Sequence, residues 1–324
     1  MTTRLLLAAL LAGTLTHAAN AQDMKSVAIS TIVEVPALTE TRDGVIEGLA
    51  ANGFEEGKNI TIDYQNANGN MPTQQQIAKK FAGERPDVIV AITTPTSQAM
   101  VSTVPSDIPI VFATVTDPIK AKLIEAYSKP GPNITGVSDA APIKQQVELM
   151  REVMPDLKTL GFIYNPGLDN AVSTLEKLRE TVEPLGIEIV ESPSPTSNEV
   201  VPAARKLVGK VDAIYVPNDT TVVAVLEAIV KVGQDTDTPI FAGETGAVGR
   251  GVVASVGLDY VAVGKVAGEM AAKVLNGTSP GDIPAVLAYE TLTDFKVVVN
   301  PASAEAMGLE LPQSLMDRAT EIIQ

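Results

Sequence analysis

The stretch VIVAITTPTSQ, residues 88–98, contains the pattern from which the fold can be predicted. A short apolar run, Val88–Ile92, ends in hydroxyl residues, and a helix candidate, Thr96–Thr103, begins directly after them. Similar apolar runs are Val27–Ile32, Ile60–Tyr64, Ile110–Ala113, Leu160–Tyr164, Ile187–Val190, Ala213–Val216, Ile240–Ala242 and Val252–Val256. The helix candidates between them are Thr39–Ala51, Pro72–Ala82, Ile119–Tyr127, Ile143–Met154, Asn170–Leu185, Asn198–Val208, Thr220–Val232 and Tyr260–Leu275. A strand followed by a helix, repeated along the chain, predicts a parallel, doubly wound sheet.

This pattern fills two blocks of the chain, from about residue 24 to 136 and from about 138 to 257. The segment between them, Lys129–Ser138, is rich in turn-forming residues and predicts a crossover that acts as a hinge. We therefore expect an α/β protein with two doubly wound parallel-sheet lobes joined by a hinge. The predicted N-terminal lobe is 22–137 plus about 258–285, and the predicted C-terminal lobe is 138–257 plus about 286–324.

The first 21 residues predict a cleaved signal peptide. Arg4 precedes the apolar run Leu5–Leu15, which is about half as long as a membrane-spanning helix needs to be, and Ala19-Asn20-Ala21 matches a cleavage pattern. The sequence has no cysteine and therefore no lipobox that could carry a lipid anchor. We expect release into the periplasm.

Composition excludes several classes of function. The net charge of −15 argues against nucleic acid as a partner, because binding a phosphate backbone needs an excess of Lys and Arg. His17 is the only histidine and lies in the predicted signal peptide, so the mature chain has neither His nor Cys. Zinc sites, Ser-His-Asp triads and cysteine nucleophiles are therefore excluded, and we expect no metal, no cofactor and no enzymatic activity.

The candidate binding residues follow the predicted strands. In an open parallel sheet, ligands bind beyond the carboxyl ends of the strands, so the polar side chains of the loops there are the candidates. The first block supplies Thr93, Thr94, Thr96, Ser97, Thr116 and Asp117. The second block supplies Asn165, Asn170, Asn218, Asp219, Thr220 and Glu244. Any of these residues also fits the simpler role of a helix N-cap.

The two groups of candidates have complementary chemistry. The hydroxyls of Thr94–Ser97 lie at a predicted helix N-terminus, which carries a partial positive charge and attracts a carboxylate. Asp219 and Glu244 lie at the ends of adjacent strands, where two acids without a basic neighbour would attract a cationic group such as an ammonium. A site of this kind is complementary to a zwitterion, and we expect an amino acid ligand.

Several motifs resemble those of a known family. They are Gly53–Asn59, Thr116-Asp117-Pro118, Asn133–Ser138, Val216–Thr220 and Leu258-Asp259-Tyr260. Together they resemble the ABC-transporter substrate-binding proteins grouped with the tryptophan/tyrosine-binding (TrpX-like) proteins, over nearly the whole mature chain.

This resemblance implies a type I periplasmic-binding-protein fold with three hinge crossings, closure on the ligand, and delivery to an inner-membrane ABC permease with its ATPase. It also implies an aromatic amino acid ligand, whose carboxylate is held by Thr94–Ser97 and whose ammonium is held by Asp219 with Asn170 or Glu244. The low aromatic content, 4% with no Trp, leaves a smaller or aliphatic ligand open.

Two rival functions remain open on the sequence alone. A ligand sensor would present the same closed form to a membrane receptor instead of a permease, and nothing in the chain separates the two. An enzyme would use Asp117, Asp219 or Glu244 as an acid or base, as in a racemase or hydrolase. For the binding protein we expect a monomer.

Overall fold

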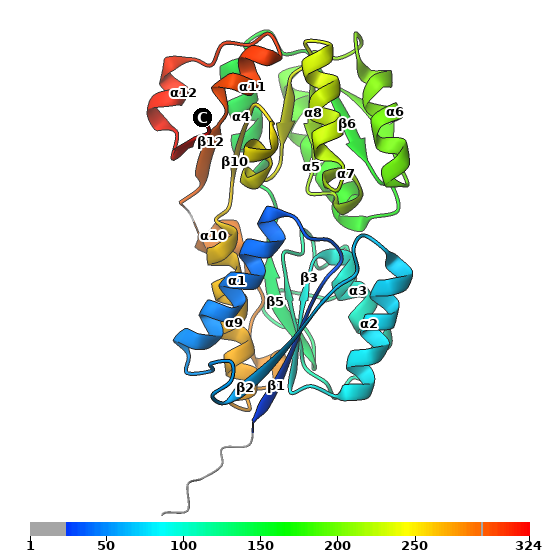
Figure 1. Ribbon diagram of the computed structural model, residues 1–324, viewed down its shortest axis with the longest axis vertical. Coiled ribbons are helices and arrows are strands. Elements are labelled where there is room, and N and C mark those ends of the chain that lie inside the picture. Colours follow the sequence, from blue (N-terminus) through cyan, green and yellow to red (C-terminus); the bar gives the residue numbers. More distant parts are fainter. Residues whose placement is uncertain (1–23, 293) are drawn as a thin grey trace, which may run out of the picture.

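The computed structural model describes residues 24–292 and 294–324 of the chain, as two α/β lobes stacked along its long axis (Figure 1). The predicted signal peptide, residues 1–21, lies outside the described residues. In the described part of the chain, no helix combines the length and the apolar character required to cross a membrane.

The first lobe is built on a six-stranded parallel sheet in the order β11-β5-β4-β3-β1-β2. Central strand β3 is buried at every residue, which explains its unbroken run of Val, Ile and Ala, because helices cover both faces of such a sheet. Its elements in chain order are β1 (Lys25–Thr31), α1 (Pro36–Ala51), β2 (Ile60–Asn66), α2 (Met71–Glu84), β3 (Val88–Ile92), α3 (Thr94–Thr103), β4 (Ile110–Ala113) and β5 (Ile134–Ser138).

The second lobe is built on a four-stranded parallel sheet in the order β7-β6-β8-β9. Its strands are β6 (Thr159–Tyr164), β7 (Glu188–Pro193), β8 (Ala213–Val216) and β9 (Ile240–Ala242). Its helical segments are α4 (Ile143–Val153), α5 (Asp169–Val182), η1 (Glu183–Leu185), α6 (Ser197–Leu207), α7 (Thr220–Val223), α8 (Leu226–Asp235) and η2 (Thr245–Arg250).

The C-terminal part of the chain contributes to both lobes. Helix α9 packs along α1 and against the six-stranded sheet, and β11 adds an edge strand to that sheet (Figure 1). Strand β12 then pairs with β10 and β13 in a small sheet beside the second lobe. These elements are β10 (Ala254–Gly257), α9 (Tyr260–Leu275), η3 (Pro280–Asp282), β11 (Val286–Leu287), α10 (Ala288–Thr291), β12 (Lys296–Val299), α11 (Pro301–Ala306), α12 (Gln313–Arg318) and β13 (Glu321–Ile322).

The predicted fold class, two doubly wound parallel-sheet lobes, is confirmed. The chain passes between the lobes three times, after β5, after β10 and after α10. The residue limits given above for each lobe stay a prediction.

Two local predictions were wrong. The segment Lys129–Ser138 was predicted to be a crossover throughout, but its second half is strand β5, which pairs with β4. The helix predicted over Ile119–Tyr127 is a series of turns, in which Lys122 has φ +58° and the N–H groups of Leu123 and Ile124 both donate to the carbonyl of Pro118. Apolar spacing cannot reveal a left-handed residue at that position.

Candidate functional site

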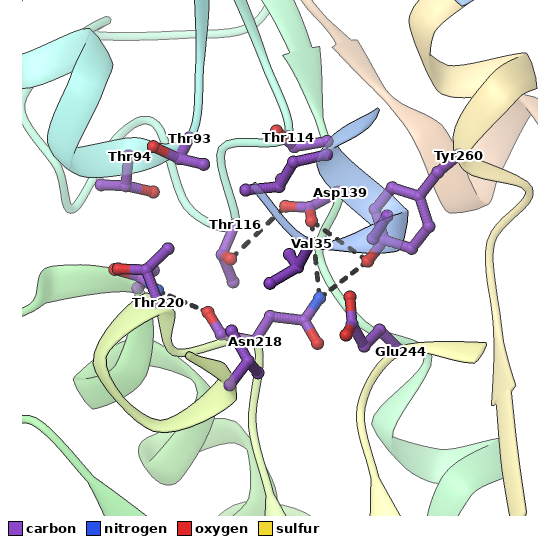
Figure 2. Close-up of a pocket in the computed structure, with 14 residues that line it drawn as sticks. Val35, Thr93, Thr94, Thr114, Thr116, Asp139, Asn218, Thr220, Glu244 and Tyr260 are labelled. Atoms are coloured by element: carbon purple, nitrogen blue, oxygen red, sulfur yellow. Dashed lines mark hydrogen bonds between the residues drawn. The ribbon is translucent and has the colours of Figure 1, made fainter. Parts of the chain in front are cut away.

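A cavity lies between the two lobes, where the carboxyl ends of strands from both parallel sheets face each other (Figure 2). The cavity is narrow, with a volume of about 30 Å³, which is room for no more than a few water molecules. The first lobe lines it with Val35, Ala37, Leu38, Thr93, Thr94, Thr114, Thr116, Asp139 and Tyr260, and the second lobe with Asn170, Asn218, Thr220, Val223 and Glu244.

Two threonines on the first-lobe side have strained backbones. Thr93 follows β3 and caps α3, and its hydroxyl accepts the N–H of Thr96, with φ at +89°. Thr114 follows β4 and has φ at +51°. A β-branched residue at positive φ is unfavourable by about 1–3 kcal/mol, and such strain is most often found where the surrounding structure holds a binding or catalytic group in place.

Asp139 is a buried carboxylate of the cavity with three side-chain donors around it. It follows β5, is 4% exposed, and accepts weak hydrogen bonds from Thr116, Asn218 and Tyr260 at 3.4, 3.5 and 3.4 Å. Burial raises its pKa to about 6, although these hydrogen bonds lower it in part. Without a ligand, therefore, this carboxyl is poorly compensated.

Glu244 is a second buried acid, with a different environment. It follows β9 and is 4% exposed, and its Oε1 atom has no hydrogen-bond partner among the described residues. Burial raises its pKa to about 7; the charge of Arg250 opposes this rise, whereas Asp139 and Glu40 add to it. No Lys or Arg is among the residues that line the cavity.

Four buried polar atoms of the cavity lack a partner in the described part of the chain: Thr94 Oγ1, Asn170 Oδ1, Asn218 Oδ1 and Glu244 Oε1. Three of them are acceptors. The Nδ2 groups of the two asparagines are engaged, since Asn170 donates to the Asn218 carbonyl at 2.7 Å and Asn218 donates to the Tyr260 hydroxyl at 2.9 Å. Buried polar atoms are nearly always paired with protein or ordered water, and a ligand rich in N–H or O–H donors would complement this set.

The structure brings seven of the twelve predicted residues to the cavity: Thr93, Thr94, Thr116, Asn170, Asn218, Thr220 and Glu244. The other five, Thr96, Ser97, Asp117, Asn165 and Asp219, are not among its lining residues. Whether any of the twelve contacts a ligand stays a prediction.

Asp219 illustrates why a residue can follow a strand without facing the cavity. Its carboxylate caps α7 by accepting the N–H groups of Thr221 and Val222, and it also accepts the N–H of Asn165. Asp117 is used in a similar way, because it accepts the N–H of Lys120 and the hydroxyl of Ser173.

Sequence reasoning missed Asp139 and Tyr260, together with Thr114 and the apolar wall of Val35, Ala37, Leu38 and Val223. Asp139 was overlooked because Ile134–Ser138 was not recognised as a strand. The rule that ligands bind beyond strand ends would otherwise have selected it. Tyr260 belongs to the motif Leu258-Asp259-Tyr260, but a tyrosine at the start of a predicted helix does not by itself indicate a binding residue. In residues 24–292 and 294–324, no cluster of three or more acidic side chains is arranged to hold a metal ion.

Comparisons with known proteins identify the family. The family model described as "ABC transporter substrate binding protein" matches residues 26–323. The chain is 38% identical to the tyrosine-binding protein of Clostridioides difficile (strain R20291) over 291 residues, which is 90% of this chain and 83% of that protein.

Two solved structures are also similar. An ABC domain from Streptococcus pneumonia in complex with L-Trp has a TM-score of 0.87 at 32% identity, and the match covers 93% of this chain and all of that one. The ligand-free, open structure of a substrate-binding protein with adhesive properties from Clostridium difficile has a TM-score of 0.69 at 38% identity. The match covers 93% of this chain and 99% of that one.

The family resemblance expected from the sequence is thus confirmed, and with it the expectation that the chain binds its substrate rather than converting it. The family model covers more than nine-tenths of the chain, and a relative well above 30% identity covers nearly the same range. The chain belongs to the ABC transporter substrate-binding protein family.

Proposed function

We propose that this protein binds an aromatic α-amino acid in the interlobe cavity and delivers it to an inner-membrane ABC permease. The observation that carries the proposal is the set of four unpartnered buried polar atoms beside two buried acids, without a Lys or Arg in the lining. An ammonium donates three hydrogen bonds and carries the missing positive charge. It therefore satisfies both needs at once.

The ammonium is assigned to Asp139, with the Oδ1 atoms of Asn218 and Asn170 as further acceptors. Asp139 and Asn218 are already joined by a hydrogen bond across the cavity, so both lobes contribute to this half of the site. An ammonium there would hold Asp139 in its charged form, because an opposite charge at close range lowers the pKa of a carboxyl.

The carboxylate is assigned to the opposite side of the cavity, at Thr94. Helix α3 begins at this residue, and its N-terminus favours negative charge. The buried Oγ1 of Thr94 has no partner in the described part of the chain and is available to donate to a carboxylate oxygen. Figure 2 places Thr93 and Thr94 on the side away from Glu244 and Tyr260.

Aromatic ligands are favoured by the apolar wall and by the relatives. The lining includes Val35, Leu38, Val223 and the ring of Tyr260, and apolar surface of this kind suits a flat ring. One relative is named for tyrosine, and a solved neighbour holds L-Trp.

Closure on the ligand is the proposed mechanism. Besides Asn218 and Asp139, hydrogen bonds join Gln98 to Asp169 at 2.7 Å, and Ser173 to Asp117 at 3.1 Å, from one lobe to the other. The overall similarity is higher to the L-Trp complex than to the open, ligand-free relative, although the sequence identity is lower. A ligand that contacts both lobes would favour the closed form through its higher affinity for it.

Export to the periplasm by a signal peptide over residues 1–21, without a lipid anchor, is part of the same proposal. So is a monomeric state, in which the closed form is recognised by the permease.

The test is a comparison of three ligands that differ by one group. L-tyrosine has both charges, tyramine lacks the carboxylate, and 3-(4-hydroxyphenyl)propionate lacks the ammonium. Isothermal titration should show binding of L-tyrosine and a loss of at least about a hundredfold for each analogue, since each leaves buried groups unpaired. Asp139→Asn should weaken L-tyrosine by at least about tenfold, whereas Asp87→Asn, at the opposite end of β3, should not. Equal binding of tyramine and L-tyrosine would contradict the zwitterion assignment.

A further inference from the structure

Glu244 differs from Asp139 in having no protein donor for its free oxygen. Asp139 accepts hydrogen bonds from three side chains, but Oε1 of Glu244 has no partner among the described residues, although the side chain is 4% exposed. Glu244 lies at the N-cap position of η2 and does not act as a cap. Arg250, the cation nearest in sequence, donates two hydrogen bonds to Glu227 and one to the Val223 carbonyl, and its Nη1 has no partner among the described residues. Its charge lowers the pKa of Glu244 in part, but it forms no hydrogen bond to Glu244, so Oε1 of Glu244 is open to a donor from a ligand.

The position of Glu244 separates it from the carboxylate side of the cavity. Figure 2 shows Glu244 and Tyr260 on one side, Thr93 and Thr94 on the other, and Asp139 between them. The loop that carries Glu244 packs against the start of α1, since a Cβ on Gly246 would lie 3.1 Å from Pro36 Cβ. This end of the cavity therefore combines one unpaired carboxyl with the apolar residues that begin α1.

The shape of an α-amino acid decides what reaches this end. Its ammonium and carboxylate are both attached to Cα and so occupy neighbouring places, here assigned to Asp139 and Thr94. The side chain leaves Cα in a third direction, and we place it on the side of the cavity away from Thr94, which holds Glu244 and Tyr260 (Figure 2). A phenyl ring there would leave the acceptor unpaired, whereas a phenol O–H or an indole N–H could donate to it.

We propose that Glu244 is the specificity-determining residue that accepts a hydrogen bond from the ring O–H or N–H of the ligand, so that the site selects tyrosine or tryptophan over phenylalanine. This inference rests on the proposed function, because it takes the amino and carboxylate positions from it. A buried acceptor that loses its donor keeps its full desolvation cost, which is why sites built around a ligand hydroxyl reject the analogue without it. We expect the preferred one of the two donors, tyrosine or tryptophan, to bind at least about thirtyfold more tightly than phenylalanine.

The experiment measures dissociation constants for L-Tyr, L-Trp and L-Phe by isothermal titration, with protein refolded from denaturant to remove bound ligand. The wild type is compared with Glu244→Met, which removes the acceptor, Glu244→Gln, which keeps one acceptor oxygen, and Asp139→Asn as the matched control. In Glu244→Met the preferred ligand should weaken by about thirtyfold while L-Phe changes by less than about threefold. Glu244→Gln should retain part of the preference, and Asp139→Asn should weaken all ligands by a similar factor.

Several results would overturn the inference. If Glu244→Met weakens L-Phe as much as L-Tyr and L-Trp, Glu244 acts on the ammonium and not on the side chain. A wild type that binds L-Phe as tightly as both others refutes the selection directly. Should the methionine variant fail to fold, Glu244→Gln decides: a reduced preference over L-Phe supports the inference, and an unchanged preference overturns it. A wild type that binds no amino acid contradicts the proposed function itself, which is a separate and recognisable outcome.

Discussion

Helices α1 and α9 cross so closely that a single added methyl group should destabilise the protein. Gly44 and Gly48 of α1 face Gly264 and Gly268 of α9. A Cβ on Gly264 would lie 2.1 Å from the carbonyl oxygen of Thr41 and 2.9 Å from Gly44 Cα. Both neighbours are backbone atoms, so the clash can be relieved only by moving one helix away from the other.

The size of the effect follows from two opposing terms. Replacing glycine by alanine inside a helix gains about 1 kcal/mol of propensity, whereas overpacking of this kind typically costs about 1–3 kcal/mol, and a contact with fixed backbone belongs at the upper end. Gly264→Ala should therefore lower the unfolding free energy by about 2 kcal/mol, or roughly 5 °C in midpoint for a protein of this size.

The matched control is Gly83→Ala in α2, where no atom lies within 4 Å of the added Cβ. This variant should be more stable than the wild type by up to about 1 kcal/mol. The assay is thermal unfolding followed by circular dichroism. Shifts of the same sign in the two variants would refute the reasoning. Because α9 begins at Tyr260, which lines the cavity, Gly264→Ala should also weaken ligand binding, and Gly83→Ala should not.

Three further predictions concern the site. The stability contributed by Glu244 should fall by up to about 3 kcal/mol as the pH rises from about 4.5 to 7. Burial raises the pKa of Glu244 from 4.5 to about 7, so over this range the folded state retains a proton that the unfolded state releases. Denaturant titrations should show a flatter dependence of stability on pH for Glu244→Gln. Asp219→Ala should lower the unfolding free energy by about 2 kcal/mol, because it leaves the N–H groups of Thr221 and Val222 uncapped. It should nevertheless weaken ligand binding less than Asp139→Asn does. The opposite ranking of the two dissociation constants would show that Asp219 contacts the ligand. Gln98→Ala removes an interlobe hydrogen bond and should raise the dissociation rate by about threefold to fivefold in stopped-flow measurements. An unchanged rate would show that this contact does not hold the lobes closed.

The sequence allowed the two sheets to be predicted because their strands are buried on both faces and consist of continuous Val and Ile runs. Strand β3 is the clearest example. Strand β5 was not predicted because its sequence, ITGVS, is short and interrupted by a glycine, and because the Pro and Gly residues before it indicated a loop. The loss of β5 also concealed Asp139, so one unrecognised strand removed the central acid from the predicted site.

The sequence predicts which polar side chains follow the strands, but not which groups each side chain bonds to in the folded protein. Asp219 and Glu244 look alike in sequence, because each is an acid that follows a buried strand. The Asp219 carboxylate accepts hydrogen bonds from backbone N–H groups, whereas Oε1 of Glu244 has no partner among the described residues. Each acid lies at the N-cap position of the helical segment that follows it, α7 or η2, so position in the sequence does not separate them. The Asp219 carboxylate accepts the first N–H groups of α7, whereas the Glu244 side chain makes no such hydrogen bond to η2. The approach of α1 and α9 likewise depends on glycines at four-residue spacing in segments that are distant in sequence.

The most direct test of the central claim is thermal unfolding of the refolded mature protein with and without a panel of L-amino acids. A ligand at 100 times its dissociation constant should stabilise the protein by about 2.7 kcal/mol, which is a shift of several degrees. Such a shift is expected for L-Tyr or L-Trp. If no amino acid raises the midpoint, the fold and family stand, but the assignment of Asp139 and Thr94 to a zwitterionic ligand is contradicted.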